Sequence, residues 1–520
     1  MSARRGSTAV DFTTDQALPA PTAIIRINHA PEMHELDDTK KTPFVQIEPG
    51  IPPELNDSLA AEIALVIICS TSQMLFSFAL GDVVVNQQGF KRALGLKNTE
   101  LPWLVGALNT ANGLSVVISG SLMDLAPPKA LMVGALAWLT LWNILGVFSL
   151  TPARAPLFFM VRAMQGLAVG TLVSGSMSIL GRIYNPGMRK NRVFSAMAAM
   201  APLGFWLGAI QGGLLKDHLE WIFGSNALIC GACCVVAYFA IPNLRPVADT
   251  FDLLGAVIAM ASCICLLFGL TQGSVTMWKP YTYTLVIIGV LLLPVFFYIE
   301  SRAPRPLIPT HLWKIKGFTP LILAYFLGFG TYMGGWQFYA IQFWLRIQNA
   351  SPLAVSLYLL PNAIVGILAA WIVSRVLHLI PGHYIYLTSM LAFSLGPVFF
   401  LPQTPGTIYW ALSFPGICLV TFGPDLAFAA ASIFITSNVS RSYQGSAGSL
   451  LVMVQNLSGA IMTSVADAVG AQVDLGEGGE IGLRGLRAIW WFAFVGGILG
   501  AGVVGGWVRI PREVEKEHTR

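Results

Sequence analysis

The sequence predicts an all-α integral membrane protein with about fourteen transmembrane helices. Hydrophobic residues make up 55% of the 520 residues and charged residues only 11%, whereas a soluble globular protein carries about 25% charged residues. The mean hydropathy is +0.66. Apolar runs of about 20 residues, the length needed to cross a hydrocarbon core, recur between short polar or Gly/Pro-rich segments. Most of the surface is therefore expected to face lipid.

The expected spans fall into two sets of seven. The first set covers 62–84, 102–120, 130–150, 156–180, 194–215, 221–241 and 253–272. The second set covers 281–299, 318–340, 352–374, 383–402, 407–434, 446–470 and 487–508. An even number of spans places both termini on the same side of the membrane.

The basic residues predict which side that is. The loop after the fourth span and the segment after the eighth carry the densest groups, Arg182, Arg189, Lys190 and Arg192 in one and Arg302, Arg305, Lys314 and Lys316 in the other. Because basic residues accumulate in cytoplasmic loops, we expect both termini in the cytoplasm, with a disordered tail at 1–58 and a short tail at 509–520. Lys91, Arg92 and Lys97 in the first outer loop are exceptions that leave the overall bias unchanged.

No motif for catalysis or cofactor binding is evident. All seven cysteines lie within the expected spans, which gives no indication of a disulfide framework or a metal site. The sequence contains no nucleotide-binding Gly-x-x-x-x-Gly-Lys-Ser/Thr loop, no His-Glu-x-x-His and no Gly-x-Ser-x-Gly. We therefore expect no enzyme activity and no bound metal, nucleotide or other cofactor.

One basic residue stands inside an apolar span. Arg162 begins the pattern Arg-x-x-Gln-Gly-x-x-x-Gly, which continues with Gln165, Gly166 and Gly170. An arginine near the bilayer centre costs about 2.5–3.5 kcal/mol even on the lowest scales, so such residues face a polar partner or a water-filled path. Arg162 is either a cavity charge that competes with a proton or binds substrate, or an anchor satisfied by carbonyls and Gln165. We favour the cavity charge, which predicts transport.

This pattern resembles the helix-four signature of the major facilitator superfamily of transporters. Gly120-x-Leu122-x-Asp124, followed by Lys129, resembles the signature between helices two and three of that family. The resemblance implies that Gly120 allows close helix packing and that Asp124 and Lys129 belong to a charged latch at the cytoplasmic face. Segment 125–128 departs from the signature, which predicts a weaker latch.

The fifth span contains a run of small residues from Gly204 to Gly213. It resembles the antiporter signature Gly-x-x-x-Gly-Pro-x-x-Gly-Gly, with Gly208, Gly212 and Gly213 at matching positions and Ala209 in place of the proline. Small residues also let two helices approach closely. A packing role and a role in antiport are therefore equally weighted interpretations.

Three further segments resemble the fourteen-helix branch of the superfamily. Phe-Asp-Leu-Leu-Gly-Ala at 251–256 precedes the first extra helix, 300–309 leads into the second half, and Gly423-Pro424-Asp425 lies in the twelfth span. The matches run from about 100 to 470. They are most similar to the fungal drug:proton antiporters of this branch, in particular the aminotriazole- and boron-resistance group with its ammonium-transporter relatives.

The resemblance implies a particular domain organisation. Two six-helix halves are expected at 59–241 and 317–508, with an inserted helix pair and its flanking loops at 242–316. Substrate would bind near the midplane between the halves, and access would alternate as one half rocks against the other. Energy would come from an ion gradient, most simply of protons.

Proton coupling requires a titratable group within the membrane whose protonation favours one conformation. Asp425 is the first candidate, because it follows Pro424, which removes a helix hydrogen bond and frees a carbonyl to line a polar cavity. The alternative is an acid fixed by helix-end donors near the cytoplasmic interface. Asp82 and Asp467 are expected to be solvated residues at the outer ends of their spans.

Polar and aromatic side chains in several spans are candidates to line the pathway. They are Gln73, Asn109, Asn112, Trp336, Gln337, Tyr339, Gln342, Asn362, Gln455 and Asn456. Any of them can instead join helices by hydrogen bonds, which contribute about 0.6 kcal/mol on average in membranes. Trp336 and Tyr339 share a helix face, so they either offer rings to an aromatic or cationic substrate or belong to an interfacial aromatic belt.

The sequence thus predicts a proton-coupled exporter of drugs, toxins or secondary metabolites that works by alternating access. An importer or facilitator of a small solute such as ammonium or borate is the alternative within the transport class, and a transport-inactive receptor is the alternative outside it. We expect a monomer in the plasma membrane, with the vacuolar membrane as the alternative. Its partners would be a small-molecule substrate, protons and the lipid bilayer, and no nucleic acid.

Overall fold

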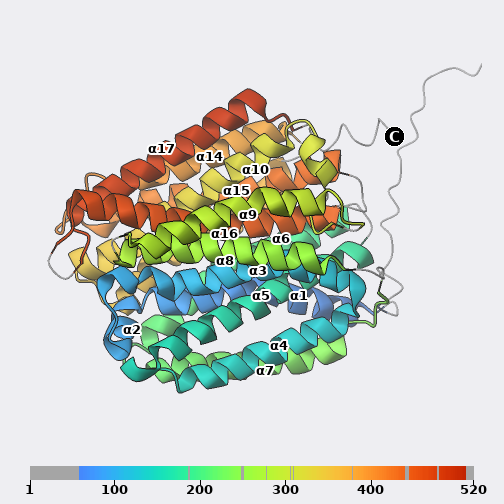
Figure 1. Cartoon of the computed structure of the whole chain (residues 1–520), viewed down its shortest axis with the longest axis horizontal. Helices are drawn as coiled ribbons and strands as arrows, with labels where there is room; N and C mark the ends of the chain where they lie inside the picture. Colours follow the sequence, from blue (N-terminus) through green and yellow to red (C-terminus); the bar gives the residue numbers. More distant parts are fainter. Residues whose placement is uncertain are drawn as a thin grey trace, which may run out of the picture. The chain divides into compact units, whose positions relative to one another are not determined.

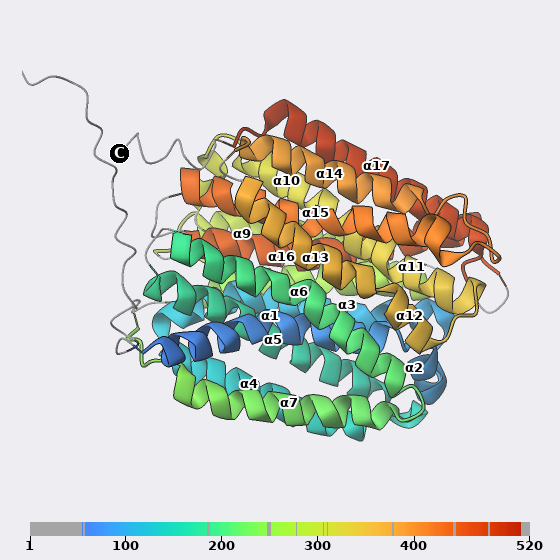
Figure 2. The ribbon, with the colours of Figure 1, turned by 180° about the vertical axis from the view of Figure 1, so that it is seen from behind.

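The computed structural model describes residues 55, 58–184, 188–246, 251–276, 278–304, 306–308, 310–376, 379–439, 444–476 and 479–510. The tails predicted at 1–58 and 509–520 lie almost entirely outside these residues. Within the described part of the chain the long helices run side by side along one direction, and the regular structure is helical apart from an isolated antiparallel bridge between Leu475 and Ile481 (Figures 1 and 2).

The first group of helices comes from the N-terminal part of the chain, and we call it the N group. It consists of α1 (Leu59–Val84), α3 (Pro102–Leu125), α4 (Pro128–Val147), α5 (Ala155–Ile183), α6 (Met188–Leu214) and α7 (Leu219–Ala240). α1 packs against α6, α3 against α5, and α4 against α7. The short α2 (Gln87–Leu94) and the 3-10 turns η2 (Asn98–Glu100) and η3 (Pro152–Arg154) lie in its connections.

A second group, the C group, comes from the C-terminal part. It consists of α10 (Phe318–Phe329), η5 (Gly330–Gln337), α11 (Phe338–Gln342), η6 (Phe343–Ile347), α12 (Pro352–Tyr358), α13 (Leu360–Val376), α14 (Gly382–Val398), α15 (Tyr409–Asn438), α16 (Gln444–Val473) and α17 (Leu483–Trp507). Contacts between α3 and α16, and of α6 with α12 and α13, join the two groups.

A helix pair lies between the groups in the sequence. α8 (Leu253–Thr276) and α9 (Pro280–Glu300) pack against each other, and the 3-10 turn η4 (Thr310–Lys314) follows them. α8 also contacts α3 of the N group and α16 of the C group. The pair therefore lies along the seam where the two groups meet.

Most of the expected spans correspond to single long helices. Among the described residues, twelve helices are long and apolar enough to cross a membrane. The other two expected spans fall on shorter elements: 318–340 covers α10, η5 and part of α11, and 383–402 covers α14, which has 17 residues. The predicted all-α membrane fold is confirmed, while the count of fourteen spans stays a prediction.

Local sequence signals explain where several helices begin. Ser58 accepts a hydrogen bond from the Ala61 amide at the start of α1, and Ser351 accepts one from Ala354 at the start of α12. Serine is a favoured residue at this position, because its hydroxyl satisfies an amide that has no helical partner. Prolines occupy the first turn of several helices, among them α3 and α4, where their missing N–H is not needed.

The interior of the C group departs from a regular α-helix at η5, which is a π-helix. Three of its eight residues are glycines. A side chain at Gly334 would come within 2.6 Å of the Thr463 backbone of α16, and one at Gly335 within 2.7 Å of Ala493 of α17. The glycines therefore allow the widened turns to pack directly against two neighbouring helices.

The outward faces are apolar and many polar side chains are inside. Phe239 of α7, for example, is 79% exposed, whereas Asn112 and Arg162 are only 1% exposed. This distribution suits a protein surrounded by lipid, in which polar groups find partners inside the bundle.

The two ends of the bundle are named by what they carry. The end with α2, on the left in Figure 1, is the α2 end. The opposite end, where α3 finishes near Asp124, is the Asp124 end.

Candidate functional site

A cavity of about 110 Å³ lies between the two groups. Its walls come from α1, α5 and α6 of the N group and from α10, η5, α13, α15 and α16 of the C group. Aromatic rings form much of the surface, namely Phe76, Phe205, Phe329, Tyr332 and Phe428, and the polar side chains are Gln73, Ser77, Gln337, Asn362, Thr421, Asp425 and Gln455. A mostly apolar surface with few polar groups is typical of small-molecule sites.

A chain of hydrogen bonds crosses the C-group wall of this cavity. The Gln337 amide donates to the Tyr332 hydroxyl at 3.3 Å, and that hydroxyl donates to Asn362 Oδ1 at 3.3 Å. Thr421 of α15 donates to the same Asn362 oxygen at 2.9 Å. The chain connects η5, α13 and α15, so a ligand that replaces one of these bonds would affect three helices.

Asp425 is the only charged residue among the described residues that line the cavity. It follows Pro424 inside α15, where a regular helix hydrogen bond is missing. Within the described part of the chain its carboxylate has no hydrogen bond or ion pair. Its Oδ2 lies 3.5 Å from where a side chain on Gly366 of α13 would begin. The carboxylate is therefore free to bind a proton or a cationic group in the cavity.

Some of the residues predicted to line the pathway line this cavity, and others lie elsewhere. Gln73, Gln337, Asn362 and Gln455 line it. Asn109 lines a second, smaller cavity of about 10 Å³, which shares Gln337 with the first. Asn112 and Asn456 instead hydrogen-bond to each other at 3.1 Å between α3 and α16. Gln342 accepts a hydrogen bond from Arg346 outside the main cavity.

Trp336 and Tyr339 are fully buried and line neither cavity. Trp336 stacks on Tyr332 with ring centroids 5.6 Å apart. The Tyr339 hydroxyl donates to the Thr463 carbonyl at 3.1 Å. Their burial excludes the interfacial aromatic belt considered from the sequence, because belt residues face the headgroups. Trp336 supports the cavity wall through Tyr332.

Arg162 lies in α5, where it contacts α3 directly and α4 through Gln165. Its Nη1 donates to Gln165 Oε1 at 3.0 Å, and its Nε donates to the Leu104 carbonyl at 3.3 Å. Gln165 in turn donates to Asn143 Oδ1 at 2.9 Å. Arg162 does not line the main cavity. Its contacts match the anchor interpretation, and its role in transport stays a prediction.

Asp82 is the nearby charge that compensates Arg162. The two side chains interact electrostatically, and Asn226 of α7 donates to Asp82 Oδ2 at 2.7 Å. Gln211 of α6 donates to Asn226 Oδ1 at 3.0 Å. Arg162 Nη2 and Asp82 Oδ1 have no hydrogen-bond partner within the described part of the chain. One acid and one base are thus buried together in the N group.

The expectation that Asp82 and Asp467 are solvated boundary residues is wrong. Asp82 is 1% exposed and Asp467 is 8% exposed. Tyr339 donates to Asp467 Oδ1 at 3.4 Å. Both acids are covered because neighbouring helices surround α1 and α16 at these positions.

The glycine motifs lie where helices touch. A side chain at Gly166 or Gly170 would come within 2.4 Å or 2.7 Å of backbone carbonyls of α3. Along α6, side chains at Gly208 and Gly212 would come within 2.2 Å and 2.3 Å of carbonyls of α1. Gly213 faces the Leu353 backbone of α12 in the C group. These contacts fit the packing interpretation, and they leave a role in antiport untested.

The predicted latch has a partner that the sequence did not single out. Asp124 pairs with Arg182 at the end of α5 at 2.5 Å, and Arg182 also donates to the Met123 carbonyl at 2.7 Å. Lys129 lies over the Tyr238 ring of α7, 5.1 Å from its centre. Gly120 packs against Ser449 of α16, so it joins the two groups near the Asp124 end.

Tyr332, Thr421, Asn226 and Gln211 were missed by sequence reasoning. A single tyrosine or threonine in an apolar span carries no signal of what it faces. Helical spacing places Tyr332 one turn before Trp336, which was the only hint. The remaining contacts join different helices and depend on how those helices pack.

These features define a class of protein, a multi-pass membrane protein with a mostly apolar cavity, carrying a few polar side chains, between two helix groups, as expected for a transporter. The sequence model of the Major Facilitator Superfamily matches residues 63–463. The protein belongs to the Major Facilitator Superfamily, whose members are membrane transporters and not enzymes.

Similar proteins include fungal transporters with several named roles. The chain is 32% identical to the low affinity ammonium transporter of Saccharomyces cerevisiae, over 89% of this chain and 91% of that protein. It is 28% identical to the efflux pump terJ of Aspergillus terreus, over 86% and 87%. It is also 28% identical to the aminotriazole resistance protein of S. cerevisiae, over 82% and 80%. The predicted resemblance to this fungal group is confirmed.

A solved structure has the same fold. The crystal structure of the human organic anion transporter MFSD10 (TETRAN) aligns with a TM-score of 0.60 at 17% identity, over 85% of this chain and 99% of that one. At this identity the likeness concerns the fold alone.

Proposed function

We propose that this protein is a proton-coupled exporter of small molecules and that Asp425 takes part in the coupling step. The observation that carries the proposal is the carboxylate of Asp425, which lines the cavity between the two groups and has no hydrogen bond or ion pair to any residue that the structure describes. An uncompensated charge inside a membrane protein is costly. A proton, or a cationic group of a substrate, would neutralise it.

Neutralisation would then be linked to conformation. The cavity has walls in both groups, so the relative position of the groups sets the polarity around Asp425. If the carboxylate is better hydrated in one arrangement, losing the proton favours that arrangement. We propose that the N group and C group are the two six-helix halves, 59–241 and 317–508, which rock against each other, with 242–316 as the inserted pair.

Arg162 is proposed to contribute through Asp82. Its guanidinium compensates the Asp82 carboxylate in this structure, while one Asp82 oxygen has no hydrogen-bond partner within the described residues. A shift of α5 relative to α1 would expose this second acid to a proton. In this proposal Asp82 and Asp425 both take part in one transport cycle, and Asp425 is the acid that lines the cavity.

The proposed location is the plasma membrane, with both termini in the cytoplasm and the Asp124 end on the cytoplasmic side. The basic residues near that end support the orientation. The protein is proposed to act as a monomer.

The test is flux in proteoliposomes with and without an imposed proton gradient, using methylammonium and 3-aminotriazole as probes. Asp425→Asn removes the titratable group and is expected to lower gradient-driven flux at least tenfold. Asp467→Asn is the matched control, because Asp467 is also a buried acid but lies outside the cavity and accepts from Tyr339. It should retain most of the flux.

Gradient-driven flux that survives in Asp425→Asn would contradict the role of Asp425. Flux that ignores the gradient in the parent protein would contradict proton coupling itself.

A facilitator or importer of a small solute is the second candidate function. The cavity of about 110 Å³ is smaller than the roughly 300–1,000 Å³ of sites for drug-sized ligands, and one relative is named as a low affinity ammonium transporter. Gradient-independent flux of methylammonium without flux of 3-aminotriazole would favour this candidate.

A further inference from the structure

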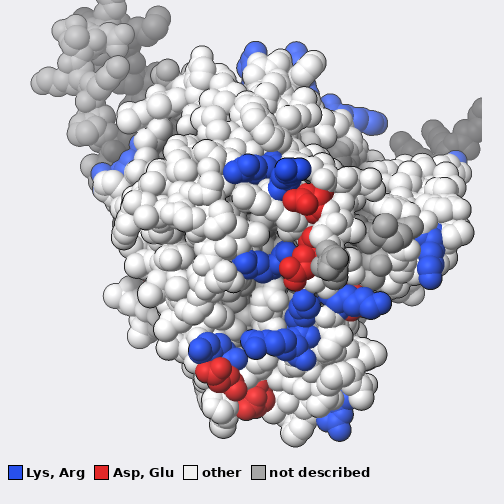
Figure 3. Space-filling model, turned by 90° about the vertical axis from the view of Figure 1, so that its left-hand side faces the viewer, with Lys and Arg blue, Asp and Glu red and all other residues white. Residues whose placement is uncertain are grey.

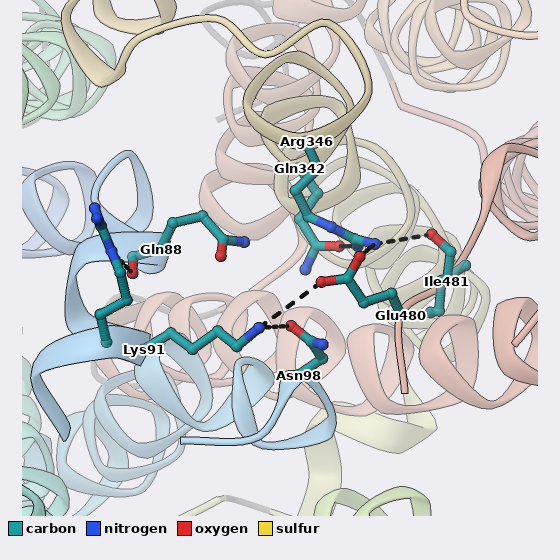
Figure 4. A network of polar contacts seen from close by, with 8 residues as sticks. Gln88, Lys91, Asn98, Gln342, Arg346, Glu480 and Ile481 are labelled. Atoms are coloured by element: carbon teal, nitrogen blue, oxygen red, sulfur yellow. Dashed lines mark hydrogen bonds and ion pairs between the residues drawn. The ribbon is translucent and has the colours of Figure 1, made fainter. Parts of the chain in front are cut away.

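The α2 end carries basic and acidic side chains next to one another across its face (Figure 3). One set joins the two helix groups (Figure 4). Lys91 Nζ of α2 lies 3.7 Å from Glu480 Oε1, and Arg346 of η6 donates to Glu480 Oε2 at 3.1 Å. α2 follows α1 of the N group, whereas Arg346 and Glu480 belong to the C-terminal part. Glu480 therefore connects cations on opposite sides of the seam.

Lys91 is held firmly to the N group. Its neighbour Phe90 is buried, with its ring 5.4 Å from Phe158 and 6.2 Å from Phe223. Lys91 also hydrogen-bonds to Asn98, just before α3. Because α2 is anchored by these contacts, Lys91 would move with the N group as a unit.

Glu480 is held equally firmly to the C group. It lies between α16 and α17, where, among the described residues, Leu475 pairs with Ile481 and the Gly476 amide donates to the Glu480 carbonyl at 2.8 Å. Arg346 also donates to the Ile481 carbonyl at 3.3 Å and to Gln342 at 3.2 Å. The Arg346 side chain is 12% exposed and the Glu480 side chain 46%, so the guanidinium is largely shielded while the carboxylate stays partly exposed.

The network lies at the α2 end, and the second cavity extends toward that end. The second, smaller cavity shares Leu80, Phe205, Met333 and Gln337 with the main one and continues to Val84, the last residue of α1. Any path from the main cavity to this end would therefore emerge beside α2. The two groups must separate there for such a path to open.

We propose that Glu480 is a gating residue of the transport cycle, which holds the α2 end closed by pairing with Lys91. The Glu480–Arg346 pair stays intact when the groups separate, because both residues belong to the C group. The Lys91–Glu480 pair is the one that breaks. This proposal concerns access to the cavity and is independent of the transported substrate and of proton coupling.

The test measures labelling of a reporter thiol, Val105→Cys, which lines the second cavity. A membrane-impermeant maleimide is added to proteoliposomes from the face that bears α2, and the rate for the parent protein with its native cysteines is subtracted. Glu480→Gln is expected to raise the rate roughly two- to fivefold, because partly exposed ion pairs contribute little each. Asp217→Asn is the control. Asp217 is also an acid at the α2 end, but its carboxylate lies 3.8 Å from the amine of Lys216, the preceding residue, so this ion pair stays within one loop. This variant should leave the rate unchanged.

Two further variants distinguish gating from loosening of the fold. Lys91→Gln breaks the same pair from α2, and an unchanged rate in this variant would overturn the proposal. A second reporter, Met197→Cys, lines the main cavity and is labelled from the opposite face. Gating predicts that Glu480→Gln leaves its rate unchanged or lowers it. A rise from both faces would mean general loosening and would also overturn the proposal.

Discussion

Arg162 shows how a single buried charge is accommodated. Two of its nitrogens donate to Leu104 and Gln165, and Asp82 supplies the opposite charge. Removing one partner of a buried pair leaves the other charge uncompensated, which typically costs about 3–5 kcal/mol. The residue is therefore expected to matter for folding, whatever else it does in transport.

Arg162→Met is expected to lower the thermal unfolding midpoint markedly in detergent, because Asp82 then lacks its cation. Arg162→Lys keeps the charge but loses the forked donors, and we expect a smaller loss of about 1.5–3 kcal/mol, the size of a hydrogen bond to a charged group. Arg154→Lys is the control, since Arg154 is exposed and its side chain donates to the Phe148 carbonyl. Equal midpoints for Arg162→Met and the parent would contradict the anchoring role.

Asp425 is a site residue that could be predicted from the sequence. Its position after Pro424 in an apolar span was enough to select it, because an intramembrane acid is rare and needs a function. Asp82 had the same chemistry but lay near the end of an expected span, where solvation seemed the natural environment. Only the packing of α1 against α6 and α7 shows that it is buried.

The packing of α1 against α6 depends on residues without side chains. Gly208 and Gly212 lie one turn apart, and each faces a carbonyl of α1. The spacing was visible in the sequence, since small residues four apart lie on one helix face. The partner helix was not visible, because the spacing does not encode which neighbour fills the groove.

Gly208→Ala tests this contact. Alanine favours a helix over glycine by about 0.5–1 kcal/mol, but here its methyl group would lie 2.2 Å from the Phe78 carbonyl. Overpacking costs about 1–3 kcal/mol, so the net effect is expected to be destabilising. Gly134→Ala in α4 is the control, because nothing lies within 4 Å of the added methyl group. Thermal unfolding should show a lower midpoint for the first variant and an equal or higher one for the second.

The π-helix η5 was not predicted from the sequence. The run Gly330–Gln337 was expected to continue a regular span, but its glycines allow tight contacts with α16 and α17. π-helical turns occur often at functional sites. Here the altered turn presents Tyr332 and Gln337 to the cavity.

At the scale of the whole molecule, the two groups meet along α3 and α16. Asn112 bonds to Asn456 at mid-helix, and Gly120 faces Ser449 nearer the Asp124 end. A rocking motion of the groups would have to change these contacts, whereas contacts inside each group would persist.

The pair Gly120→Cys and Ser449→Cys tests this motion. The Ser449 Cβ lies 3.6 Å from the Cβ position of a residue at 120, within the range of about 3.5–4.5 Å for a disulfide. Oxidation is expected to form the bridge and reduce flux of methylammonium or 3-aminotriazole to background, and a reductant should restore it. The two single variants and the parent, treated with the same oxidant, are the controls. Undiminished flux through the bridged protein would show that these helices do not separate.

The sequence by itself determined the helical membrane class, nearly all the helix positions and the family, because hydropathy, breaker residues and short signatures are local properties. It also selected Asp425 and the amides Gln73, Gln337, Asn362 and Gln455. Only the tertiary structure decided that Arg162 pairs with Asp82, that Asp124 pairs with Arg182, and that Lys91 and Glu480 meet across the seam. Each of these contacts joins residues on different elements, and its formation depends on how the helices pack.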